Sequence, residues 1–166
     1  SCTWVRQGDP CGPLFFALTI QPILRSVQES FPGVRIIAYL DDIVLQGPWE
    51  VVKCAYSELR SQLSAAGLQI QRDKCLVYSP DSDQADQLAF QLGVKQAVGG
   101  LLVAGCPVGA PDFISAQVLT AAAHTEHLVH TLMELQLPVQ DKLLLLRKSL
   151  QVKVAHFARC VRYELV

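Results

Sequence analysis

Residues 38–47, AYLDDIVLQG, set two adjacent aspartates between two apolar, β-branched runs. The pattern predicts a β-hairpin with Asp41 and Asp42 at or beside its turn. Aspartate is common in turns, so an ordinary hairpin turn would explain the pair. The apolar neighbours favour another explanation, because two carboxylates pressed against an apolar sheet are costly unless a divalent cation compensates their charge.

Length and composition are typical of a globular chain. It has 166 residues, of which 51% are hydrophobic and 17% are charged, so we expect one good core and a small appended subdomain. The formal net charge is −1. An overall charge this close to zero does not attract a polyanion, so a nucleic-acid interface would have to be a local site.

The six cysteines are scattered and include no C-x-x-C pair, which argues against a zinc knuckle or ribbon. We expect them to be reduced and mostly buried, in a reducing compartment. They are Cys2, Cys11, Cys54, Cys75, Cys106 and Cys160. The chain opens on no signal-peptide pattern and its apolar runs are too short for a bilayer span, so we expect a soluble protein with no membrane partner.

The spacing of apolar residues predicts a helix on each side of the hairpin. The first covers residues 9–29, with Asp9 as its N-cap and Pro10 at its first position. It is apolar on nearly every side, so we expect it to be buried. The second covers residues 48–66, ends at Gly67 and is expected to cover the sheet.

The rest of the chain adds strands and then helices. Residues 68–79 alternate in the manner of a strand and run into a polar loop at 80–86. Residues 99–109 are rich in glycine and β-formers and predict a second hairpin. From residue 114 the pattern is helical, with a break near Pro138. The predicted fold class is α/β (α+β), with an antiparallel sheet backed by helices and a helical region after it.

Four blocks of sequence together resemble a known family. QGDPCGPLFF at 7–16 and AYLDD at 38–42 resemble motifs B and C of reverse transcriptases, most similar to those of eukaryotic non-LTR retrotransposons. GLQIQRDKCLVYS at 67–79 resembles motif D, and GLLVAGCPVGAPDF at 100–113 resembles motif E. The resemblance implies a partial polymerase palm over residues 1–113 and a helical thumb over residues 114–166.

The resemblance assigns catalytic roles to the first hairpin and to motif D. Asp41 would be a catalytic metal ligand, Asp42 its acidic neighbour, and Tyr39 would line the primer end. Lys74 stands at the lysine position of motif D, where a cation could neutralise or protonate the leaving pyrophosphate. The alternative for Lys74 is an ordinary solvated lysine at a strand end. Asp9 is assigned to helix capping and not to catalysis.

The resemblance assigns binding roles to motifs B and E. Gln7 and Gly8 match positions that face the incoming nucleotide and the template, and Gly12 would let the backbone approach closely. Gly105 would shape the primer grip. A simple tight hairpin explains Gly105 and Gly109 equally well.

The implied activity is RNA-directed DNA polymerisation, in which two Mg²⁺ (or Mn²⁺) ions activate a primer 3′-hydroxyl. Its partners would be an RNA template, a DNA primer and deoxynucleoside triphosphates, acting inside the cell, in the nucleus. Motif A, which carries the other metal-binding aspartate, is expected N-terminal of Ser1 with the fingers of a parent chain, so residues 1–166 alone should not polymerise. The alternative is a decayed or domesticated remnant that acts as a structural or nucleic-acid-binding module.

Two further patterns in the C-terminal part have less specific meanings. Three histidines at 124, 127 and 130 drift around a helix face, which favours a solvated or partner-facing helix over a zinc site. A row of cations without an intervening acid could be a solvated face or could track phosphates on a thumb helix. The row consists of Lys142, Arg147, Lys148, Lys153, Arg159 and Arg162.

Overall fold

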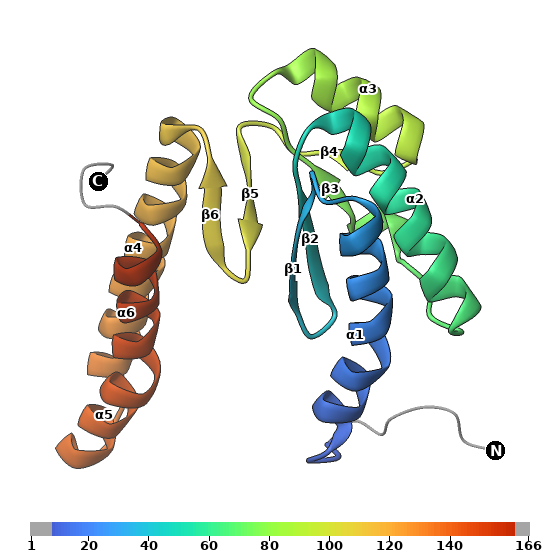
Figure 1. Ribbon diagram of the computed structural model, residues 1–166. Coiled ribbons are helices and arrows are strands. Elements are labelled where there is room, and N and C mark those ends of the chain that lie inside the picture. The colour runs from blue at the N-terminus through green and yellow to red at the C-terminus, as the bar shows by residue number, and fades with distance from the viewer. Residues whose placement is uncertain (1–7, 162–166) are drawn as a thin grey trace. The chain divides into compact units, whose positions relative to one another are not determined.

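The computed structural model describes residues 8–161, apart from the side chains at 153 and 157. In this part of the chain, helices and strands mix as predicted (Figure 1). The helices are α1 (Gly12–Ser30), α2 (Trp49–Ala65), α3 (Ser82–Leu92), α4 (Pro111–Glu134), α5 (Val139–Leu145) and α6 (Gln151–Cys160), with a 3₁₀ turn η1 (Arg72–Lys74) and a π turn η2 (Leu146–Leu150). The strands are β1 (Arg35–Tyr39), β2 (Asp42–Gln46), β3 (Leu76–Val77), β4 (Lys95–Gln96), β5 (Gly100–Val103) and β6 (Cys106–Gly109).

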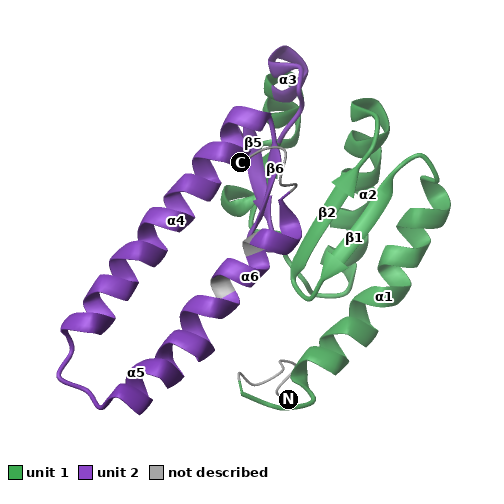
Figure 2. Ribbon diagram, turned by 90° about the vertical axis from the view of Figure 1, so that its left-hand side faces the viewer, with its two compact units in different colours: residues 1–77, 86–96 green, residues 78–85, 97–166 purple. Residues whose placement is uncertain are grey.

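The described strands form three two-stranded sheets. β1 pairs with β2 and β5 with β6, both antiparallel, which confirms the two predicted hairpins. β3 pairs with β4 in parallel. The chain divides into two compact units, residues 1–77 with 86–96 and residues 78–85 with 97–166, coloured separately in Figure 2. The palm and thumb boundaries at residues 113 and 114 stay a prediction.

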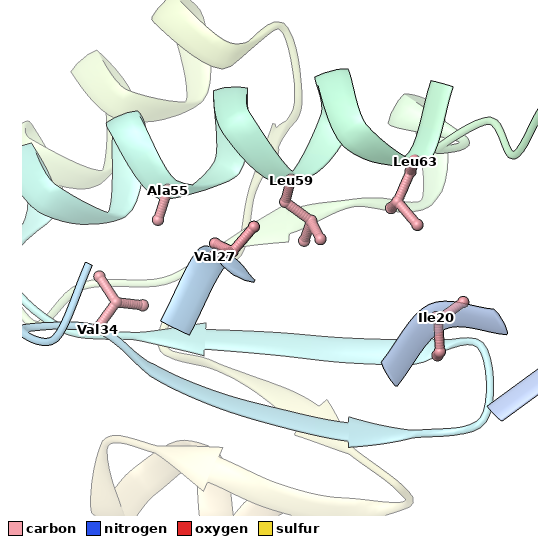
Figure 3. Close-up of a cluster of buried hydrophobic side chains, with 6 residues drawn as sticks. All are labelled: Ile20, Val27, Val34, Ala55, Leu59 and Leu63. Carbon is pink, nitrogen blue, oxygen red and sulfur yellow. The ribbon is translucent and has the colours of Figure 1, made fainter. Parts of the chain in front are cut away.

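The core of the first unit lies between the β1–β2 hairpin and helices α1 and α2 (Figure 3). Its members share nearly complete burial and come from α1, α2 and the residue before β1: Ile20, Val27, Val34, Ala55, Leu59 and Leu63. In α2 the buried positions recur every four residues, so one stripe of the helix faces the core. This helix covers the hairpin, as expected.

The end of α2 is fixed by a glycine, as the sequence predicts. Gly67 adopts a φ of +82°, and its N–H donates to the Ser64 carbonyl at 3.0 Å. The Leu68 N–H donates to the Leu63 carbonyl at 2.9 Å. This pair of bonds is the Schellman arrangement, which satisfies carbonyls that the helix would otherwise leave free.

Two predictions between residues 68 and 92 are wrong. Residues 68–79 form a 3₁₀ turn and a two-residue strand, not a long strand. The expected polar loop at 80–86 contains the start of helix α3. Asp81 Oδ1 accepts hydrogen bonds from the N–H groups of Asp83 at 3.0 Å and Gln84 at 3.3 Å, so polar residues here cap a helix.

The second unit consists of the β5–β6 hairpin and the C-terminal helices. The hairpin turn is Ala104–Gly105, where both residues have positive φ, +49° and +78°, as a tight type I′ turn requires. Pro138 stands immediately before α5, which confirms the predicted break. No helix in the described part of the chain is long and apolar enough to cross a bilayer.

Candidate active site

The two aspartates lie at the tip of the first hairpin. Tyr39 pairs with Asp42, so the loop between the strands is only two residues long, Leu40 and Asp41. Leu40 has a φ of +54°, which is unusual for a residue with a side chain. Such a conformation costs about 1–2 kcal/mol and persists only where the surrounding structure imposes it. The hairpin therefore holds this turn in a defined, strained shape.

The register of the hairpin decides which side chains share a face. Residues directly opposite each other in a sheet point to the same side. Ile36, Ile43 and Leu45 face α1 and α2 and pack against the core. Tyr39 and Asp42 therefore lie on the opposite, open face of the hairpin.

Both aspartates are exposed, and Tyr39 keeps 69% of its surface exposed. The expectation that the carboxylates press against an apolar sheet is wrong. The reason is their position, because Asp41 lies in the loop itself and Asp42 at the end of the hairpin. The face that Asp42 shares with Ile37 and Val44 points away from the core, and Ile37 keeps 45% of its surface exposed. The two carboxylates are thus accessible to a ligand from solvent.

A glutamine on α1 fixes the position of the hairpin strand. The Gln28 side-chain amide donates from Nε2 to the Val34 carbonyl at 2.6 Å, and its Oε1 accepts from the Ile36 N–H at 3.1 Å. The side chain therefore satisfies one donor and one acceptor of the backbone at the start of β1. This connection ties the aspartate hairpin to the motif B helix.

The motif B residues lie before and at the start of α1. Gln7 lies outside the described residues. Gly8 is exposed, with a φ of +90° and open space where a β-carbon would lie, and Gly12 is buried at the first position of the helix. Asp9 does not act as the N-cap of α1, because Cys11 holds that position. Asp9 Oδ1 instead accepts a hydrogen bond from the Cys11 N–H at 2.9 Å, which closes a turn before the helix.

Helix α1 is not buried on every side. Leu14, Phe15 and Leu18 each keep more than half of their surface exposed, and the burial predicted for this helix is wrong on that face. The face forms one wall of an open apolar groove of about 360 Å³ in the first unit. The groove is lined by Leu14, Ala17, Leu18, Ile20, Gln21, Leu24, Ala38 and Leu40. Because Leu40 belongs to the aspartate turn, this groove reaches the candidate site.

Lys74 is the last residue of the 3₁₀ turn η1 and is exposed. It does not lie on a strand, which corrects the predicted local structure. The next residue, Cys75, lies close to Tyr56 of helix α2. Burial raises the pKa of Tyr56 above its usual value, and the Cys75 thiol adds a smaller contribution in the same direction. The contact between Cys75 and Tyr56 therefore places the segment that carries Lys74 beside α2.

Gly105 belongs to the other compact unit, in the β5–β6 turn. A β-carbon at this position would lie 3.3 Å from His156 Nε2 of α6. Glycine therefore serves both the positive φ and the close approach of a helix side chain. The tight-hairpin explanation of Gly105 is sufficient for what the structure shows.

The histidine trio and the cation row have ordinary structural surroundings. All three histidines at 124, 127 and 130 are exposed, and the described residues contain no group of three or more potential metal ligands. Lys142 Nζ donates to the Met133 carbonyl at 2.8 Å, so this lysine satisfies the end of α4. Arg147, Lys148 and Arg159 are exposed, whereas Arg162 and the Lys153 side chain lie outside the described residues.

The donor chemistry at the hairpin tip fits a magnesium ion. Mg²⁺ keeps several of its waters and is commonly bound through one or two carboxylates together with substrate phosphates. Asp41 and Asp42 supply two adjacent, exposed carboxylates on a turn that the hairpin holds in place. These residues could contribute oxygen ligands, and further ligands would have to come from substrate or from other parts of the protein.

The mixed helix and strand fold with its helix-backed hairpin is consistent with part of a polymerase palm, and the comparison with protein families identifies the class. The family model described as "Reverse transcriptase (RNA-dependent DNA polymerase)" matches residues 1–97. The chain belongs to the reverse transcriptase family.

The chain spans only a small part of the length of the two relatives that it matches. It is 28% identical over 155 residues to the "Retrotransposable element SLACS 132 kDa protein" of Trypanosoma brucei gambiense, covering 93% of this chain and 13% of the relative. It is 24% identical over 90 residues to a "Gag-Pol polyprotein" of Bovine immunodeficiency virus (strain R29), covering 54% of this chain and 6% of that polyprotein. No solved structure matches.

Proposed function

We propose that residues 1–166 are the motif B to motif E part of an RNA-directed DNA polymerase of a retrotransposon. The observation that carries the proposal is the family match over residues 1–97, which includes an exposed Asp41–Asp42 pair at a hairpin tip. The retrotransposon protein among the relatives supports the element type. The partners are an RNA template, a DNA primer and deoxynucleoside triphosphates, and the place of action is the nucleus.

In this proposal the β1–β2 hairpin carries the residues that bind the metal ions and the primer end. Asp41 and Asp42 hold Mg²⁺, or Mn²⁺ in its place, which supplies charge stabilisation for the attacking and leaving oxygens. Tyr39 lies on the same open face as Asp42 and lines the primer end. The strained turn at Leu40 and the Gln28 connection keep this face in one geometry, which reduces the reorganisation needed during reaction.

The remaining assigned residues serve the substrates. Gln7 and Gly8 face template and nucleotide, and Gly12 admits close backbone approach at the start of α1. Lys74, exposed on η1, neutralises or protonates the leaving pyrophosphate. Gly105 shapes the hairpin that grips the primer.

Residues 1–166 alone are proposed to be inactive. A two-metal site needs the motif A aspartate, which none of the four motif blocks supplies. We propose that the palm and fingers of the parent chain provide it, and that the isolated chain binds Mg²⁺ only weakly.

The test is primer extension on an RNA template with Mg²⁺ and deoxynucleotides, using the full-length protein that contains these residues. Asp41→Asn should abolish extension. The matched control is Asp86→Asn on α3, which removes an exposed carboxylate away from the hairpin tip and should extend normally. A full-length, folded protein that extends no primer would favour the remnant acting as a binding or structural module, and extension by Asp41→Asn would refute the assigned role.

A further inference from the structure

Two cysteines and a histidine meet where the β5–β6 hairpin contacts α6, within the second unit. Cys106 follows the hairpin turn directly, and Cys160 is the last residue of α6, 54 positions later. The Cys106 thiol donates to the Cys160 carbonyl oxygen at 3.7 Å. Cys160 Sγ lies 3.8 Å from His156 Nε2 and 4.0 Å from His156 Nδ1.

The two thiols differ in their surroundings. Burial, together with the neighbouring Cys160 thiol, raises the pKa of Cys106 to about 11. Cys106 is therefore a protonated thiol at neutral pH and a poor nucleophile. Cys160 Sγ has the His156 imidazole within contact distance, and an adjacent base is a usual partner of a nucleophilic thiol. The pair thus consists of an attacking thiol and a resolving thiol.

The other described cysteines lack this arrangement. Cys11 and Cys54 are exposed and contact no second thiol in the described part of the chain. Cys75 donates to the Gln71 carbonyl at 3.4 Å. None of the five described cysteines is fully buried, which corrects the expectation that the cysteines would be mostly buried.

The β5–β6 hairpin and α6 lie against each other at these cysteines. A β-carbon at Gly105 would lie 3.3 Å from His156 Nε2, so the turn before Cys106 lies directly against the last turns of α6. A disulfide requires the two α-carbons to lie within about 4.4–6.8 Å of each other. The Cys106 thiol already contacts the residue with which it would pair.

We propose that Cys106 and Cys160 form a thiol–disulfide exchange site that reacts with low-molecular-weight disulfides, such as glutathione disulfide. The Cys160 thiolate attacks one sulfur of glutathione disulfide, forms a mixed disulfide and releases one glutathione thiolate. The Cys106 thiol then loses its proton to solvent, attacks the Cys160 sulfur and releases the second glutathione. Two cysteine thiols are oxidised and one glutathione disulfide is reduced to two glutathione molecules.

The product would join the hairpin to the last helix. The bond closes a loop of 54 positions in sequence and fixes the β5–β6 turn against α6. Reduction by glutathione reverses the reaction, so the site responds to the thiol–disulfide ratio of its surroundings. The proposal does not depend on the polymerase activity, because thiol–disulfide exchange involves only the two cysteines and the neighbouring histidine.

The experiment equilibrates the full chain with glutathione disulfide at neutral pH, quenches with acid and maps the cysteines by mass spectrometry. We expect a chain that has lost two hydrogen atoms and a cross-linked peptide that contains Cys106 and Cys160. Cys54→Ser, the matched control, should keep this cross-link. Cys106→Ser should stop at a glutathione adduct on Cys160, and Cys160→Ser should leave Cys106 largely unmodified.

His156→Gln tests the role of the imidazole. It should slow cross-link formation by roughly threefold to tenfold without changing the final product, because it removes the imidazole that contacts Cys160 Sγ. Circular dichroism checks that the variants fold, and Cys106→Ala serves as a second variant if serine disturbs the hairpin. Glutathione adducts confined to Cys11 and Cys54, with Cys106 and Cys160 still reduced, would overturn the proposal.

Discussion

Replacing Gln28 by methionine should loosen the hairpin that carries the aspartates. The substitution keeps the length of the side chain and a good helix former on α1. It removes the 2.6 Å bond to the Val34 carbonyl and the 3.1 Å bond from the Ile36 N–H. Each neutral hydrogen bond contributes about 1 kcal/mol net, so we expect a loss of about 2 kcal/mol in the free energy of unfolding of the first unit.

Native-state hydrogen exchange measures this loss where it arises. A loss of about 2 kcal/mol corresponds to roughly thirtyfold faster exchange of the amides in the β1–β2 ladder. Urea denaturation followed by circular dichroism gives the independent value of the unfolding free energy. The amides of α4, in the other unit, provide an internal reference.

The matched control is Gln21→Met on the same helix. Gln21 is exposed and lines the apolar groove, so its replacement should leave ladder exchange unchanged. If the two variants lose the same stability, or if Gln28→Met changes hairpin exchange by less than about twofold, the side-chain amide does not hold the strand and the reasoning from these bonds is refuted.

Three further predictions concern the glycines, the aspartate turn and Cys106. Gly100→Ala should cost roughly 3 kcal/mol, because a β-carbon there would clash with the Phe113 ring and lie 2.6 Å from the Val108 carbonyl oxygen. Gly67→Ala should cost only about 1 kcal/mol, because a β-carbon there meets no other atom and only the positive φ is unfavourable for alanine. Equal losses of unfolding free energy for Gly100→Ala and Gly67→Ala in urea denaturation would contradict this. Leu40→Val should destabilise the hairpin by roughly 1 kcal/mol, because a β-branched side chain tolerates positive φ poorly, and unchanged thermal unfolding would show that the turn is not strained. Burial raises the pKa of Cys106 from 9.0 to about 11, so its contribution to stability is complete below about pH 9 and is lost as the pH rises toward about 11, where the unfolded thiol ionises first. The urea midpoint of the wild type should therefore fall more steeply over that range than that of Cys106→Ala, and parallel curves would argue against the shift.

Local signals predicted the elements that they control directly. The alternation around Asp41 and Asp42 gave the first hairpin, and glycine-rich residues 99–109 gave the second. Gly67 marked the end of α2 because only a residue without a β-carbon adopts its φ at low cost. These features depend on residues that are close together in the sequence, which is why they can be predicted from it.

Helix α3 was missed although its start has a recognisable signal. Asp81 followed three positions later by Gln84 has the spacing of a capping box, and Asp81 Oδ1 does accept the N–H of Gln84. Ala85, Leu88 and Ala89 then form a buried stripe at helical spacing. The polar residues of the first turn hid this pattern, because capping residues and loop residues have the same composition.

The exposure of the candidate site could not be predicted from local pattern. A helix that is apolar on nearly every side was expected to be buried, yet Leu14, Phe15 and Leu18 line an uncovered face. Burial depends on which other segments pack against a face, and that information is not local. The same reason explains Asp42, because its exposure depends on which face of the hairpin packs against α1 and α2, and that packing is not visible in the local pattern.

The most direct test of the proposed role of Asp41 is single-turnover incorporation of one deoxynucleotide by the full-length protein and its Asp41→Asn variant. The role of a metal-binding carboxylate lies in the chemical step, so the rate of phosphodiester formation should fall by at least about 10³-fold while the nucleotide dissociation constant changes by less than about threefold. A variant that incorporates nucleotide at the wild-type rate would contradict the assignment of this hairpin as the catalytic site.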